Sequence, residues 1–322
     1  MSEIIIRADD VSTWFPVRGP LGRVVNHVKA VDGVSMFIRE GETYGLVGES
    51  GCGKSTFGRT LIRLLEPTRG SVTLFGQDIS HLSEKELLRY RKDVQIVFQD
   101  PYTSLNPRQR IGDMLMEVLH IHQPQLSRDE RMEVALQILS QVGLLTEHFY
   151  RYPHEFSGGQ RQRIGLARAL ILGPRLVVCD EPVSALDVSI QSQIINLLRD
   201  LQSQRQLSYL FISHDMSVIK YISDRVGVMY LGHLVEEAET DELFDHPLHP
   251  YTQTLMSAVP STDPHASRER IILQGDLPSP INPPEGCVFH TRCPYAQPDC
   301  ARNAPTLREV GSNHLVACPY AQ

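Results

Sequence analysis

A glycine-rich segment carries the residues that most directly predict chemistry. It reads Gly48-Glu49-Ser50-Gly51-Cys52-Gly53-Lys54-Ser55-Thr56 and fits the phosphate-binding (Walker A) pattern G-x-x-x-x-G-K-[ST]. Residues 44–47 before it have the apolar pattern of a strand, and residues 57–65 after it have helical apolar spacing. Small residues let such a loop aim consecutive backbone N–H groups at phosphate oxygens. The segment therefore predicts a nucleotide site, in which Lys54 reaches the β- and γ-phosphates and Ser55 coordinates Mg²⁺.

Polar residues also follow three apolar strand patterns. Gln99 follows residues 94–98, and His214 comes soon after residues 209–212. The third run, residues 176–179, ends in Asp180 and Glu181. Nearly continuous apolar runs are typical of strands buried on both faces, and a helical pattern between the last two makes a β-α-β unit. These patterns predict an α/β core with a largely parallel sheet.

Two further motifs complete a set that identifies a family. Ser157-Gly158-Gly159-Gln160 opens a helical pattern, and Ser184-Ala185-Leu186-Asp187 follows the two carboxylates. The order and spacing of these motifs resemble the nucleotide-binding subunit of ATP-binding cassette (ABC) transporters, over roughly the first three quarters of the chain. The Ser-Gly-Gly-Gln signature discriminates, because kinases and GTPases lack it.

The resemblance implies ATP and Mg²⁺ as cofactors and ATP hydrolysis as the reaction. Asp180 would hold Mg²⁺ with Ser55 and Gln99. Glu181 would orient or deprotonate the attacking water, so we expect it to be catalytic together with His214, at the γ-phosphate, and Gln99. In the family two cassettes meet head to tail, so Ser157 to Gln160 would bind the partner's nucleotide and Asp187 would communicate across the dimer. The adenine-stacking residue stays open among Trp14, Phe15, Val25 and His27.

The fold class that follows is α/β. We expect a P-loop NTPase (RecA-like) core with a parallel sheet, an antiparallel β subdomain and an inserted helical subdomain. The cassette would span residues 1–246, with the helical subdomain at about 102–157, where strand patterns give way to helical spacing. Residues 247–322 are rich in proline and contain four cysteines, which predicts a loop-rich C-terminal extension.

Composition limits the partners and the compartment. The 322 residues carry a net charge of −7, so charge gives no case for binding nucleic acid. The N-terminus lacks a basic leader with a long apolar run, and no segment reaches the roughly 18 apolar residues of a spanning helix. We expect a cytosolic chain, peripheral at the cytoplasmic face of the cell (inner) membrane.

Three segments favour one branch of the family. Residues 99–107, residues 181–189 and the tail, with His249-Pro250-Tyr251-Thr252 and residues 286–294, resemble ATPases of bacterial dipeptide and oligopeptide (peptide/nickel) importers. This resemblance implies import of di- or oligopeptides. The implied partners are two transmembrane permeases, an extracytoplasmic substrate-binding protein and a second ABC ATPase, for which we favour a paralogue and hence a heterodimer.

Other functions remain open at this stage. Related importer ATPases serve nickel, glutathione or sugars. A non-transport cassette ATPase acting on DNA or ribosomes is disfavoured, because the chain has one cassette and no sustained heptads between the phosphate loop and the signature. An exporter ATPase is disfavoured by the importer-like tail.

Four cysteines gather in the extension, at Cys287, Cys293, Cys300 and Cys318. Four thiolates in a loop-rich module suit an iron–sulfur cluster or a tetrahedral zinc site. Relatives with this cysteine arrangement imply a [4Fe-4S] cluster, with Zn²⁺ and unligated thiols as the alternatives. A cytosolic setting disfavours disulfides.

Overall fold

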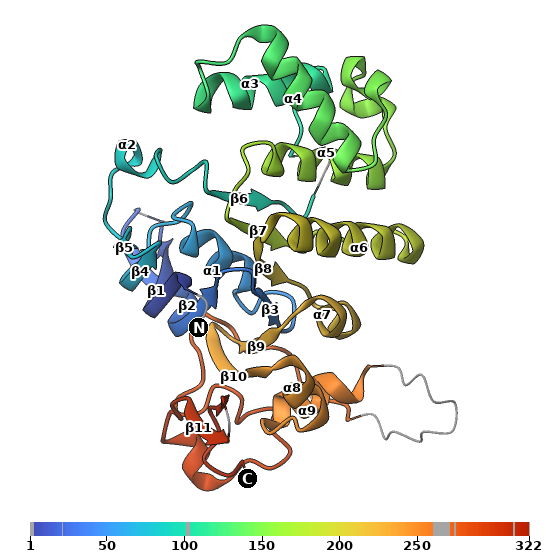
Figure 1. Ribbon diagram of the computed structural model, residues 1–322. Helices are drawn as coiled ribbons and strands as arrows, with labels where there is room; N and C mark the ends of the chain where they lie inside the picture. The colour runs from blue at the N-terminus through green and yellow to red at the C-terminus, as the bar shows by residue number, and fades with distance from the viewer. Residues whose placement is uncertain are drawn as a thin grey trace, which may run out of the picture. The chain divides into compact units, whose positions relative to one another are not determined.

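The computed structural model describes residues 3–20, 22–100, 104–259, 271–273, 275–311 and 313–321. Its chain divides into two compact units, traced in Figure 1. The terminal unit comprises residues 3–81 and 212–322, and the central unit comprises residues 82–211. Each unit is described by itself.

The terminal unit holds two groups of strands. One is an antiparallel sheet of order β2-β1-β4-β5, and the other runs β11-β12-β10-β9-β3. The pairing of β3 with β9 is parallel, and that of β9 with β10 is antiparallel. Its strands are β1 (Ile4–Arg18), β2 (Val24–Arg39), β3 (Thr43–Val47), β4 (Arg69–Leu74), β5 (Gln77–Asp78), β9 (Arg225–Tyr230), β10 (His233–Glu239), β11 (Arg308–Gly311) and β12 (His314–Val316). Its helices are α1 (Lys54–Leu61), α7 (Met216–Ile222), α8 (Thr240–Asp245), α9 (Pro250–Ser257) and the 3₁₀ helix η3 (Pro298–Ala301).

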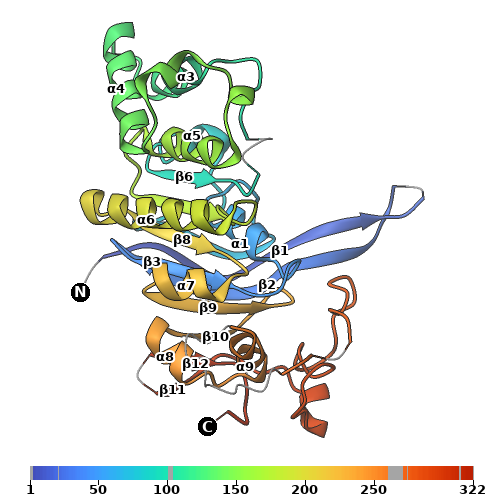
Figure 2. The same ribbon diagram turned by 90° about the vertical axis from the view of Figure 1, so that its right-hand side faces the viewer.

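The predicted antiparallel β subdomain is present in this unit. Strands β1 and β2 run side by side as a long ribbon (Figure 2), paired from Ile4 with Arg39 to Arg18 with Val24. All five residues of β3 are buried, as the apolar pattern predicted. A strand buried on both faces gives the loop that follows it a fixed starting point.

The central unit contains three strands in the order β8-β7-β6, with β6 and β7 parallel. Every residue of β7 and β8 is buried. Its elements are α2 (Glu84–Leu87), β6 (Val94–Val97), α3 (Ile111–His122), α4 (Arg128–Gln141), η1 (Thr146–Tyr150), η2 (Pro153–Glu155), α5 (Gly158–Leu170), β7 (Leu176–Asp180), α6 (Val188–Arg205) and β8 (Ser208–Ile212). The parallel strands and the helices between them confirm the α/β core.

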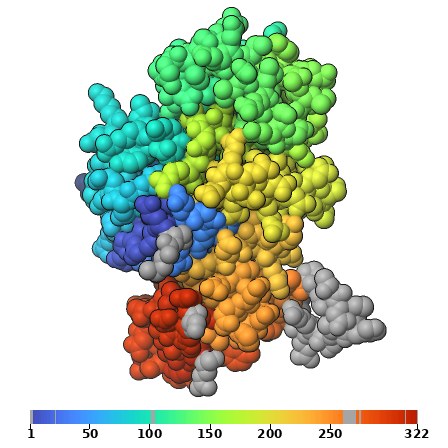
Figure 3. Space-filling view, in the orientation of Figure 1, coloured from blue at the N-terminus to red at the C-terminus, as the bar shows by residue number. Residues whose placement is uncertain are grey.

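Helices α3 and α4 form the predicted helical insert, which fills a continuous green lobe in Figure 3. Gly112 of α3 lies against Phe149 of η1, where a Cβ would come within 2.4 Å of the ring. The expected start of the insert near residue 102 lies outside the described residues. Within the part of the chain that the structure describes, no helix is both long enough and apolar enough to cross a membrane.

The described part of the C-terminal extension is rich in loops, as the sequence predicted, but it also contains regular elements. Besides α9 it contributes β11 and β12, and β12 pairs antiparallel with β10 through Glu236–Val316 and Glu237–Leu315. The tail therefore extends the sheet of the terminal unit, whereas the domain boundary at residues 246 and 247 stays a prediction.

A buried histidine joins β12 to β10 and α8. Nε2 of His314 lies 2.7 Å from Glu236 Oε1, and Nδ1 lies 3.3 Å from Glu242 Oε1. Glu236 is fully buried and also accepts hydrogen bonds from the N–H groups of Leu248 and His249. Burial lowers the pKa of His314, but the hydrogen bonds and charges of Glu236 and Glu242 outweigh burial, so that its pKa is raised above 6.5.

This pair makes stability depend on pH. A raised folded-state pKa contributes stability that is fully present below the unfolded value of 6.5 and is lost as pH rises through the folded value. We expect the free-energy difference between wild type and His314→Gln, measured by urea unfolding, to be largest at acidic pH and to shrink as pH rises. His246→Gln is the control, because His246 also contacts Glu242 but is 70% exposed. A difference that grows with pH would contradict the assignment.

Candidate nucleotide-binding and catalytic site

The phosphate loop joins β3 to α1 and depends on glycine at two close approaches. Gly48 has φ +151°, and a Cβ there would lie 2.1 Å from the carbonyl oxygen of Met229. Gly53 has φ +109°, and a Cβ would lie 2.0 Å from the carbonyl oxygen of Ala30. At Gly51, with φ +82°, a Cβ would meet no described atom within 4 Å. The backbone is therefore clamped at both ends of the loop and open in the middle, where a phosphate would lie.

Lys54 folds back into this loop. Its Nζ donates hydrogen bonds to the carbonyl oxygens of Gly48, at 2.8 Å, and Glu49, at 3.0 Å, and the residue is 4% exposed. Burial raises the pKa of Cys52, so its thiol stays neutral, although the charge of Lys54 opposes this shift. A buried cation inside an open glycine loop fits a polyphosphate, which supports ATP as the ligand. Helix α1 begins at Lys54, and Ser55 and Thr56 follow in its first turn.

His214 lies close to this loop within the terminal unit. The preceding residue, Ser213, donates its N–H to the carbonyl oxygen of Leu46, two residues before Gly48, at 3.2 Å. The following residue, Asp215, caps α7 by accepting from two backbone N–H groups. His214 itself is exposed. The turn is thus fixed on both sides while the imidazole stays accessible.

The central unit brings Gln99 and Glu181 together. Nε2 of Gln99 donates to Glu181 Oε2 at 3.0 Å. Glu181 has φ +48°, a left-handed conformation that is uncommon for a residue other than glycine and that occurs often at functional sites. Asp180, the last residue of β7, is 1% exposed. The end of β7 therefore carries two carboxylates: that of Asp180 is deeply buried, and that of Glu181 accepts a hydrogen bond from the amide of Gln99.

The signature motif forms the start of α5. Ser157 is the N-cap, and its side chain and that of Gln160 exchange hydrogen bonds with each other's backbone N–H in a capping box. Gly159 lies against Ile190 of α6, where a Cβ would come within 2.4 Å. Asp187 is the exposed N-cap of α6. Glycine at this position lets the two helix starts approach closely, and Ser157 remains exposed.

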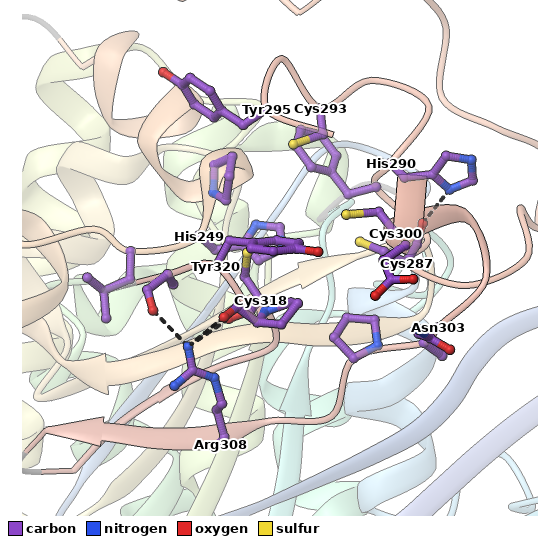
Figure 4. Close-up of a pocket in the computed structure, with 18 of the residues that line it drawn as sticks. His249, Cys287, His290, Cys293, Tyr295, Cys300, Asn303, Arg308, Cys318 and Tyr320 are labelled. Carbon is purple, nitrogen blue, oxygen red and sulfur yellow. Dashed lines mark hydrogen bonds between the residues drawn. The ribbon is translucent and has the colours of Figure 1, made fainter. Parts of the chain in front are cut away.

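The four cysteines of the extension line one cavity of about 680 Å³ in the terminal unit (Figure 4). All four are free thiols. Burial raises the pKa of Cys287 and of Cys293, and the nearby cysteines add to this shift. Among the described residues, however, no three His, Cys, Asp or Glu side chains form a group that could hold a metal ion. The structure thus brings the cysteines to one cavity without forming a ligand set.

Known proteins match the chain over the cassette and over the C-terminal extension. A family model described as "ABC transporter" matches residues 31–184, and one described as "Oligopeptide/dipeptide transporter, C-terminal region" matches residues 235–300. The oligopeptide transport ATP-binding protein AppF of Bacillus subtilis is 57% identical over 98% of this chain and 97% of its own length. The chain belongs to the ATP-binding proteins of oligopeptide ABC transporters.

Other relatives agree with this assignment. The oligopeptide transport ATP-binding protein OppF of Salmonella typhimurium is 56% identical over 90% of this chain and 87% of its own length. The ATP-binding cassette MJ0796, solved as a dimer in a post-hydrolysis state with ADP and Pi, has a TM-score of 0.66 at 27% identity, covering 73% of this chain and 99% of that one. CbiO1 of Clostridium perfringens has a TM-score of 0.64 at 25% identity, and the match covers 76% of this chain and 92% of that one. These matches confirm the predicted P-loop ATPase fold of this ABC subunit.

Sequence reasoning missed two residues that contact the phosphate loop of this ABC ATPase. Arg292 forms a two-pronged ion pair with the side chain of Glu49, and the hydroxyl of Tyr251 accepts the N–H of Glu49 at 2.8 Å. Both belong to segments that pointed to the family, but no local pattern connects them with residue 49.

The residue that stacks on adenine stays open among Trp14, Phe15, Val25 and His27. The ring of Trp14 has the cations of Lys29 and Arg69 within 5.1 Å of its centroid.

Proposed function

We propose that this chain is the ATP-hydrolysing subunit that energises import of di- or oligopeptides across the cytoplasmic membrane in a multi-subunit ABC importer. The observation that carries the proposal is that similarity to AppF extends over the tail as well as the cassette. ABC cassettes in general share the phosphate loop and signature, whereas the matched tail is described for oligopeptide and dipeptide transporters. The tail therefore favours peptides over nickel, glutathione or sugars.

The residues have separate tasks at the nucleotide. When bound, MgATP supplies the γ-phosphoryl group that is transferred to water. Lys54 and the backbone N–H groups of residues 48–56 would bind the phosphates, while Ser55 and Asp180 would bind Mg²⁺. His214 would contact the γ-phosphate.

Glu181 would act as the general base. Its carboxylate can orient a water and accept a proton, and the 3.0 Å hydrogen bond from Gln99 holds that carboxylate in place. The same bond would make Gln99 sensitive to what Glu181 contacts. Because Gln99 leads into the helical insert, this coupling would carry the state of the nucleotide to the permeases.

A second ATPase subunit would complete each nucleotide site. Ser157, Gly158 and Gly159 lie at the N-terminus of α5, with Ser157 exposed, and a helix N-terminus attracts anions through its N–H groups and dipole. They would bind the γ-phosphate held by the partner cassette, with Gln160 fixing the cap and Asp187 beside the seam. We favour a paralogous partner, hence a heterodimer.

Replacing the general base separates binding from hydrolysis. Glu181→Gln keeps the hydrogen bond to Gln99 possible but removes the proton acceptor. We expect MgATP affinity to stay near the wild-type value while turnover falls by about 10²-fold or more. Equilibrium binding of ATP and steady-state release of phosphate check both quantities. Glu155→Gln, on the exposed surface of η2, is the matched control. Unchanged turnover in Glu181→Gln would refute the assignment.

The transport role is tested through the partners. We expect the chain, isolated from its native membranes in mild detergent, to co-purify with two permeases, a second cassette and a substrate-binding protein, all identified by mass spectrometry. The subunit would then lie peripherally at the cytoplasmic face of that membrane. Recovery at good yield with cytosolic proteins alone would instead favour the non-transport ATPase.

We also propose that the four cysteines bind a [4Fe-4S] cluster. Four thiols are the donor set that such a cluster requires, and all four line one cavity. Since the described side chains do not form a ready ligand set, the thiols would have to approach one another and lose their protons on binding. The role we assign is to fix the fold of the extension.

Metal analysis decides between the three alternatives for these thiols. We expect anaerobically purified protein to be brown and to contain about four iron and four sulfide ions per chain, and Cys300→Ser to lose most of them. Cys179→Ala, which removes a buried cysteine outside the cavity, should keep them. Colourless protein with about one zinc would favour the zinc site, and metal-free protein would leave unligated thiols.

A further inference from the structure

An arginine of the C-terminal extension pairs with a carboxylate inside the phosphate loop. Nη1 of Arg292 lies 2.8 Å from Glu49 Oε2, and Nη2 lies 3.2 Å from Glu49 Oε1. This two-pronged geometry is the strong form of an arginine–carboxylate contact. The side chains are 9% and 30% exposed, so water screens the pair less than an ordinary surface salt bridge.

Glu49 is held at three of its groups. Its N–H donates to the hydroxyl of Tyr251, its carbonyl accepts from Lys54, and its carboxylate accepts from Arg292. Two of these three partners belong to residues 247–322. The conformation at the second position of the loop is therefore fixed largely from the extension.

An aromatic cluster fixes the elements that carry these two partners. Tyr230, Tyr251 and Phe289 are each at most 1% exposed, and their ring centroids lie 4.8 to 5.4 Å apart. Tyr230 ends β9, Tyr251 lies in α9, and Phe289 is three residues before Arg292. The segment that carries Arg292 is thus anchored by a buried aromatic cluster, which places its guanidinium next to the phosphate loop.

The ion pair with Arg292 offsets the negative charge that Glu49 brings to the phosphate loop. A phosphate loop must attract a polyanion, and a carboxylate within the loop repels it over several ångströms. A paired guanidinium cancels that repulsion at its source. Lys54, which lies inside the loop, is then left to attract the ligand.

We infer that Arg292 is a positioning residue of the nucleotide site, which neutralises the carboxylate of Glu49 beside the bound phosphates, so that the C-terminal extension completes the binding site for MgATP. This inference rests on the proposal that residues 48–56 bind MgATP. It assigns the extension a part in nucleotide affinity, independent of any metal at its cysteines.

The test is a double-mutant cycle on the full-length chain, with the dissociation constant of MgATP as the readout. Arg292→Ala leaves the charge of Glu49 uncompensated, so we expect affinity to fall by about tenfold. Glu49→Gln combined with Arg292→Ala removes both charges and should restore affinity to within about twofold of wild type. Arg302→Ala, an exposed arginine of the same extension, is the matched control and should bind as wild type does. A purely structural role for Arg292 would give no such rescue.

The outcomes separate this inference from the function on which it rests. Wild-type protein that fails to bind MgATP, or Lys54→Ala that binds as well as wild type, would refute the nucleotide site itself. Given a binding wild type, unchanged affinity in Arg292→Ala would overturn the inference, and so would a double variant as weak as the single one. If Arg292→Ala does not fold, Glu49→Gln alone decides, because it must bind MgATP at least as tightly as wild type, and weaker binding would overturn the inference.

Discussion

The phosphate loop depends on two places where its backbone has no room for a side chain. Gly48 lies against the carbonyl of Met229, and Gly53 lies against the carbonyl of Ala30. Strand β9 contributes Met229 and strand β2 contributes Ala30, so both sheets of the terminal unit take part in shaping the loop. Because each contact is to backbone, no rotation of a side chain could relieve a larger residue there. The conformation of the phosphate loop follows from this constraint.

One consequence is the burial of Lys54. With both ends of the loop fixed, the carbonyl groups of Gly48 and Glu49 converge on the ammonium of Lys54, a residue that is 4% exposed. A buried cation is costly unless polar groups solvate it, and the carbonyls of Gly48 and Glu49 do so here. An arriving phosphate would exchange these dipoles for a full negative charge, so the loop is organised for an anion before one binds. The ion pair of Glu49 with Arg292 then keeps the loop's own carboxylate from opposing that exchange.

Much of the fold and site could be predicted because the signals are local. Glycine spacing, an apolar strand before it and polar residues at strand ends lie within short windows, and they indicated residues 48–56, Gln99, Asp180 and Glu181. The capping box at Ser157 and Gln160 is likewise a four-residue pattern. What the sequence could not reveal is pairing between distant segments. Strand β12 pairs with β10 between residues 78 or 80 positions apart, Arg292 contacts Glu49 across 243 positions, and neither contact has a local sequence pattern.

The cysteine cavity was likewise only partly predictable from the sequence. The sequence predicted that four cysteines would gather, and they do line one cavity, but their approach to one another depends on loops whose course no short pattern encodes. The extension that carries them contacts the rest of the terminal unit through side chains other than the thiols: the buried His314–Glu236 pair, the aromatic cluster around Phe289, and the ion pair of Arg292 with Glu49. None of these contacts is made by a thiol, so the contact of the extension with the phosphate loop is separate from ligation at the cysteines. Ligation at the cysteines would therefore act on the fold of the extension itself, whereas Arg292 and Tyr251 connect the extension with the phosphate loop.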